Sequence, residues 1–119
     1  MIYVTIERLA PDSPHVLSFV VEGHAEYDVP GKDLVCAAVS AVTFGTCNSI
    51  VTLTGVIPIH EMERGAGLLD ITIPDSARTV PETWSQVQLL IESMVVMLRT
   101  IEQTYGDYIT IETIYHKGG

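Results

Sequence analysis

The sequence is poor in cysteine and in basic residues, and both shortages narrow the functions open to it. Two cysteines occur among 119 residues, too few for a scaffold held together by disulfides. Six Lys and Arg stand against fifteen Asp and Glu, which gives a net charge of −9 at pH 7. Direct nucleic-acid binding is therefore disfavoured, because neutralising phosphates requires a basic surface. An acidic surface instead attracts basic proteins or peptides.

The sequence also lacks the usual signs of membrane targeting. No run of about 18 uninterrupted apolar residues is present, so no membrane-spanning helix is expected. Glu7 is acidic and no basic stretch precedes an apolar run at the N-terminus, so no signal peptide is expected. With 47% hydrophobic residues, the chain is predicted to be one folded cytoplasmic domain over residues 1–119 with reduced thiols.

The hydrophobic pattern predicts a single α+β domain with the element order ββαββαβ. Strands are predicted at residues 2–8, 16–22, 57–63, 68–73 and 108–115. Helices are predicted at residues 33–54 and 82–105, the second from apolar residues that recur at three- and four-residue steps. Gly106 is the expected stop of the second helix. We expect one mixed or antiparallel sheet with both helices packed on one face.

The first predicted helix has a clear start and an unusual composition. Asp33 is a good N-cap candidate, because its carboxylate can accept a hydrogen bond from a first-turn N–H. The residues that follow are apolar nearly all round the helix, so this helix is expected to be buried on most sides. Gly55 and Pro58 end it.

Cys36 is the candidate nucleophile. If Asp33 caps the helix, Cys36 is the third helical residue, and its sulfur lies near unpaired N–H groups and the positive end of the helix dipole. That setting favours the reactive thiolate. The nearby Asp33 carboxylate works against it unless that group is occupied in capping or in orienting another side chain.

His24 is the candidate base. It follows the second strand by one glycine, Gly23, and Pro30 and Gly31 allow the chain to fold back so that a Cys–His pair forms. Asp33, or Ser40 one turn after Cys36, would orient the pair. The residues alone leave other roles open: a core thiol, a surface histidine, a plain helix cap and a small packing residue.

The remaining candidate groups give no second site. Cys47 lies in the middle of the helix among apolar residues and is interpreted as an inert core thiol. His15, His60 and His116 are scattered, and no pair has metal-ligand spacing such as CxxC or HxxxH. We therefore expect no metal and no cofactor.

The segment from Gly23 to Ser40 resembles a known family signature. It reads Gly-His-Ala, then Tyr27, then Gly-x-Asp-Leu-Val-Cys-Ala-Ala-Val-Ser, with twelve positions from His24 to Cys36. This is similar to the ribosomal-processing cysteine protease family, called Prp, and the likeness extends over nearly the whole chain. The resemblance implies a Cys36–His24 dyad, with Gly23, Asp33 and Ser40 as supporting residues, and a homodimer.

The resemblance also implies a substrate. Family members remove a short N-terminal extension from large-subunit ribosomal protein number twenty-seven. An acidic chain suits a basic substrate tail, and the loop residues Ala25, Glu26, Tyr27 and Asp28 are candidates for contacting it. Glu26 and the stiff Asp28-Val29-Pro30 segment depart from the family pattern, which bears on the peptide preference. The alternatives are a phage capsid or scaffold protein as substrate, a small amide or ester as substrate, or a non-enzymatic dimeric assembly factor that holds a basic ribosomal protein.

Overall fold

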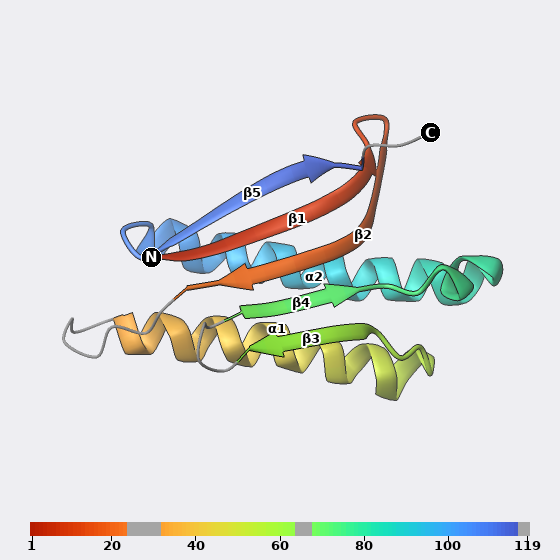
Figure 1. The fold of residues 1–119 in the computed structure, drawn as a ribbon, viewed down its shortest axis with the longest axis horizontal. Helices are drawn as coiled ribbons and strands as arrows, with labels where there is room; N and C mark the ends of the chain where they lie inside the picture. The colour runs from red at the N-terminus through yellow and green to blue at the C-terminus, as the bar shows by residue number, and fades with distance from the viewer. Residues whose placement is uncertain (24–31, 64–67, 117–119) are drawn as a thin grey trace.

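The computed structural model describes residues 1–23, 32–63 and 68–116. The elements are β1 (Ile2–Ala10), β2 (Ser13–Glu22), α1 (Lys32–Thr54), β3 (Ile59–Glu63), β4 (Leu68–Thr72), the 3-10 helix η1 (Asp75–Thr79), α2 (Pro81–Tyr105) and β5 (Ile109–Tyr115). Figure 1 shows one sheet with both helices behind it. The predicted α+β class, the element order and the placement of the helices on one face are confirmed.

The five strands form one mixed sheet in the order β3-β4-β2-β1-β5. All neighbours are antiparallel except β1 and β5, which are parallel. The parallel pair joins the first and last strands of the chain, and the Ile2 N–H donates to the Tyr108 carbonyl at 2.8 Å where the pair begins. The sheet edges are therefore β3 and β5.

The core lies between the sheet and the two helices. Alternation along β1 buries Ile2, Val4 and Ile6 on the helix side, and the register places Phe19 of β2 opposite Ile6. The periodic stripe of α2 is buried as its spacing predicts: Val87, Ile91, Met94 and Leu98. None of the helices in residues 1–23, 32–63 and 68–116 lies on the other face of the sheet.

α1 departs from its prediction, because it is not buried on most sides. Its outer face, defined here as Leu34, Ala37, Ala41, Phe44 and Val51, is exposed, with Leu34 exposed to 59%. Charged residues are absent from Leu34 to Thr54. By length and hydropathy alone α1 also passes as a membrane-crossing helix, which is weak evidence for one helix. Hydropathy indicates how apolar a helix is, but it does not indicate how many of its faces are covered by other parts of the chain.

The two glycines that follow the helices adopt different backbone conformations. Gly55 ends α1 with a φ of 77°, a left-handed conformation that favours glycine, as expected. Gly106 ends α2 as expected, in a right-handed conformation with a φ of −59°. The short helix η1 was not predicted, and it leads directly into α2.

Candidate active site

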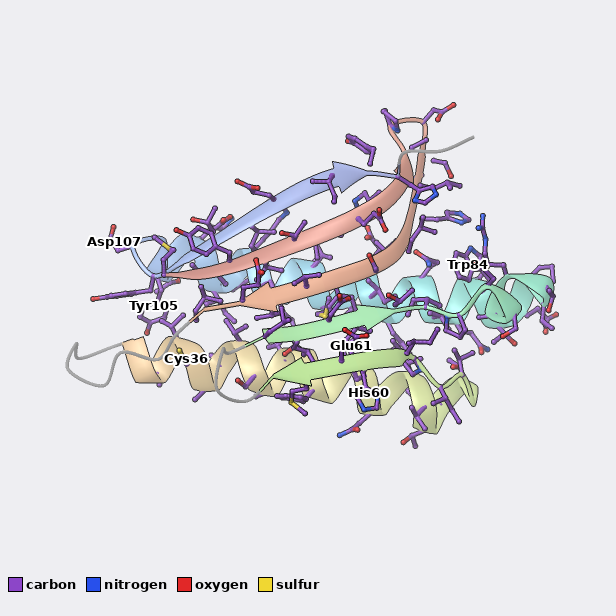
Figure 2. The ribbon with its side chains drawn as sticks, viewed as in Figure 1. Cys36, His60, Glu61, Trp84, Tyr105 and Asp107 are labelled. Carbon is purple, nitrogen blue, oxygen red and sulfur yellow. The ribbon has the colours of Figure 1, made fainter. Side chains whose placement is uncertain are left out.

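Cys36 lies at the start of α1, as the sequence predicts. Figure 2 shows Cys36 near the N-terminal end of α1. Its side chain is partly buried and packs against the hydrophobic core. Helical side chains lean toward the N-terminus, so the sulfur lies over the first turn. The first four N–H groups of a helix have no acceptor within it, and this turn carries the positive end of the helix dipole.

The helix begins one residue earlier than predicted. α1 starts at Lys32, so Asp33 is its second residue and not the N-cap, and Cys36 is its fifth residue and not its third. The physical reason is that Lys32 already has helical backbone conformation, which moves the capping position ahead of it. The Asp33 side chain lies outside the described residues. Asp33 still precedes Cys36 by three positions and so belongs to the same face of the first turn.

The two thiols differ in position. Cys47 lies eleven residues beyond Cys36, in the middle of α1 where all backbone N–H groups are already bonded. Burial raises the pKa of the Cys47 thiol, and a hydrogen bond with the Cys47 backbone offsets this in part. Cys47 therefore stays protonated near neutral pH, which fits an unreactive core residue. Both cysteines are free.

Gly23 holds the end of β2 in a conformation that requires glycine. Its φ is 150°, and a Cβ at this position would lie 2.8 Å from the Met1 carbonyl oxygen and 3.0 Å from the Ile2 Cα. Side chains do not tolerate such contact with a neighbouring backbone. Gly23 thus fixes where the chain leaves the sheet, immediately before His24.

Several predicted site residues lie outside the described residues. These are His24, Ala25, Glu26, Tyr27 and Asp28. Ser40 is described and exposed, four positions after Cys36 on α1. Its carbonyl accepts a hydrogen bond from the Thr43 hydroxyl at 3.3 Å. Within the described part of the chain, no group of three or more His, Cys, Asp or Glu is arranged to hold a metal ion.

Tyr105 shares the Cys36 end of the molecule, although periodicity assigned it only to the core. α1 and α2 run in opposite directions (Figure 1), so the last turn of α2 comes to the end where α1 begins. Tyr105 is half-buried and packs against the same hydrophobic core as Cys36, and Figure 2 places both residues at this end. Two successive helices are expected to pack antiparallel. This expectation could have placed Tyr105 at the same end of the molecule as Cys36.

Comparison with known proteins identifies the family. Residues 1–110 match the family model for the cysteine protease Prp. The ribosomal processing cysteine protease Prp of Bacillus subtilis (strain 168) is 40% identical over 113 residues, which cover 95% of this chain and 97% of that protein. The corresponding protein of Staphylococcus aureus (strain NCTC 8325 / PS 47) is 32% identical over 108 residues, which cover 91% of this chain and 96% of that protein.

A solved structure extends the likeness to the fold. The essential ribosomal processing protease Prp from S. aureus, crystallised with a substrate peptide, matches with a TM-score of 0.81 and 31% sequence identity. The match covers 96% of this chain and 100% of that one. The chain therefore belongs to the Prp family and is a cysteine peptidase.

Proposed function

We propose that this chain is a cytoplasmic endopeptidase that removes a short N-terminal extension from large-subunit ribosomal protein number twenty-seven. The observation that carries the proposal is the position of Cys36 in the first turns of α1, where N–H groups without an acceptor inside the helix can stabilise developing negative charge. The B. subtilis and S. aureus relatives are named for ribosomal processing, and the S. aureus protease binds a substrate peptide. A phage structural protein is the variant substrate for the same chemistry.

The proposed reaction uses Cys36 as nucleophile and His24 as base and acid. His24 accepts the thiol proton, and the sulfur attacks the carbonyl carbon of the scissile bond. First-turn N–H groups of α1 donate to the resulting oxyanion. His24 returns the proton to the leaving amine as the C–N bond breaks, which leaves a thioester. His24 then takes a proton from water, and the hydroxide attacks the thioester carbon and displaces the Cys36 thiolate. The carboxylic acid product leaves, and His24 returns its proton to the sulfur.

The positions of the other histidines support His24 as the partner of Cys36. His15 accepts a hydrogen bond from the Trp84 indole at 2.6 Å, and Trp84 lies at the opposite end of the molecule from Cys36 (Figure 2). His116 lies 3.5 Å from a Glu7 carboxylate oxygen. His60 is also well separated from Cys36 along the molecule (Figure 2). Of the four histidines, only His24 follows directly on the strand end that Gly23 fixes.

We also assign supporting roles. Asp33 and Ser40 flank Cys36 at helical spacing and are the candidates for orienting the dyad. Gly23 sets the path of the chain into His24. The loop residues Ala25 to Asp28 are the candidates for contacting the substrate, and two of the four are acidic, which suits a basic tail.

Thiol labelling tests the proposed activation of Cys36. At neutral pH, iodoacetamide should alkylate Cys36 at least about tenfold faster than Cys47, because only the thiolate reacts. Peptide mapping by mass spectrometry gives the two rates, and both thiols should label equally in urea-unfolded protein. Equally slow labelling in the folded protein would support a non-enzymatic factor that holds a basic ribosomal protein.

The outer face of α1 supports the proposed homodimer. Leu34, Phe44 and Val51 are exposed to 59%, 40% and 42%, and no charged residue interrupts the helix between Leu34 and Thr54. Apolar residues exposed together on one helix face favour a contact with another molecule. A second copy presents the same face, so two α1 helices can pack against each other across a two-fold axis.

A charge on this face should separate the dimer. Ala41 is exposed within the chain, so Ala41→Glu leaves the folded protomer intact but places a carboxylate in an apolar contact. We expect light scattering to give twice the 13.0 kDa chain mass for the wild type and one chain mass for the variant. Ser93→Glu on the exposed side of α2 is the matched control and should remain dimeric. A monomeric wild type would refute the homodimer.

A further inference from the structure

The two edge strands of the sheet, β5 and β3, differ in whether a side chain forms a hydrogen bond with their outer backbone groups. At the β5 edge, Glu102 of α2 accepts a hydrogen bond from the Ile111 N–H at 2.9 Å, so a side chain caps one N–H group of this edge. At the β3 edge, the described residues offer no such cap, and β3 is paired with β4 alone. An uncapped edge strand presents backbone N–H and C=O groups that can pair with another chain.

The side chains of β3 extend this open surface. Ile59 and Glu61 belong to the uncovered face of the sheet, and His60 and Met62 to the helix side. All four are exposed, with Ile59 exposed to 57% and Met62 to 45%. A strand added beside β3 would therefore cover apolar surface on both faces, in addition to forming main-chain hydrogen bonds.

The negative charge at the β3 edge determines which side chains are favourable in a strand that binds there. Glu61 stands directly opposite Asp70 of β4, on the same face, and no described Lys, Arg or His forms an ion pair with either carboxylate. Like charges in directly opposed cross-strand positions are destabilising. A basic side chain from an added strand would remove this repulsion, whereas an acidic one would increase it.

The same charge disfavours a second copy of β3 as the occupant. The antiparallel register that pairs all five residues of β3 opposes Glu61 with Glu61 of the other copy. That arrangement adds two more carboxylates to a face where, among the described residues, no basic side chain forms an ion pair with Glu61 or Asp70. The homodimer proposed above uses the outer face of α1 and leaves the β3 edge free.

We propose that the outer edge of β3 binds, as an added strand, an extended basic segment of the substrate next to its scissile bond. The inference rests on the proposed protease function. The register connects the edge to the site, because Met62 is opposite Leu69, and Leu69 is opposite Val21, two residues before Gly23. A docked strand that runs along β3 thus arrives at the end of the sheet where the chain enters His24. A basic residue at the position opposite Glu61 lies on the same face as Glu61 and Asp70.

A charge substitution with a matched control tests the docking. Glu112 of β5 lies on the same face and in the same cross-sheet row as Glu61, at the capped edge. The probe is a synthetic peptide that holds the extension of ribosomal protein number twenty-seven and the residues that follow it. Glu61→Gln should raise KM by about threefold or more at low ionic strength, with kcat kept and the melting temperature unchanged or higher. Glu112→Gln should leave KM unchanged.

The outcomes separate this inference from the function on which it rests. If the wild type does not cleave the peptide, the proposed function fails and the docking fails with it. If cleavage is normal and the two glutamine variants have equal KM values, the docking alone is wrong. The difference between them should also disappear at about 0.5 M salt, because exposed charge pairs are screened there.

Backbone methylation of the peptide tests strand pairing itself. Peptides carrying one N-methyl group at successive positions beside the scissile bond are titrated against the Cys36→Ala variant, which does not consume them. An added strand donates alternate N–H groups to β3, so affinity should fall at every second position. Uniform loss or no loss along the segment would contradict strand addition.

Discussion

Replacing Cys36 with alanine should lower kcat/KM for the extension peptide by about 10⁴-fold or more, with little change in folding. The sulfur is the only group proposed to form a bond with the substrate, so its removal leaves binding and oxyanion stabilisation without a nucleophile. Cys36 is partly buried at the edge of the core. Loss of one small atom there should change the free energy of unfolding by no more than about 1 kcal/mol. A fluorogenic peptide assay and urea unfolding measure the two effects.

Cys47→Ala is the matched control for this prediction. It removes the same atom from the same helix, but from a thiol whose pKa burial has raised. Activity should remain near that of the wild type, although the lost packing costs about 1 kcal/mol of stability. Full activity of Cys36→Ala, or loss of activity only in Cys47→Ala, would show that the nucleophile has been assigned to the wrong residue.

Gly23→Ala should damage both stability and catalysis. The added Cβ would lie 2.8 Å from the Met1 carbonyl oxygen, and the φ of 150° is strained for any residue with a side chain. Backbone strain and overpacking of this kind cost about 2 kcal/mol or more. The clash is with backbone, so the end of β2 must move, and His24 follows it directly. We expect kcat/KM to fall by at least about tenfold at a temperature where the variant is fully folded.

Gly45→Ala separates this effect from the general consequence of adding a methyl group. A Cβ at Gly45 meets no atom within 4 Å, and alanine favours helix over glycine by about 1 kcal/mol. Gly45→Ala should therefore be as stable as the wild type or more so, with unchanged turnover. If Gly23→Ala behaved in the same way, Gly23 would have no positioning role at the entry to His24.

The sequence predicted most of the architecture because the local patterns are strong. Alternation in β1 and β2 and the apolar stripe of α2 each identify one element and its buried face. Cys36 was placed in the first turns of α1 for the same reason, since the helix pattern begins at a defined point. An error of one residue at Asp33 moved the capping position but not the end of the helix on which Cys36 lies.

Features that depend on partners distant in the chain were not predictable in this way. The parallel pairing of β1 with β5 joins residues about a hundred positions apart. By hydropathy alone, the exposed outer face of α1 is indistinguishable from a core face. An apolar helix face has the same composition whether it packs against the same chain or against another one. The difference between the β5 edge and the β3 edge depends on one hydrogen bond, which Glu102 accepts from the Ile111 N–H, and no local pattern contains it.

The most direct test of the account is the intact mass of large-subunit ribosomal protein number twenty-seven, with its N-terminal extension, after incubation with this protein. Wild-type protein and the Cys36→Ala variant are compared in parallel. The account predicts loss of the extension at a single bond with the wild type and an unchanged mass with Cys36→Ala. An unchanged mass with both proteins, or the same truncation with both, would contradict it.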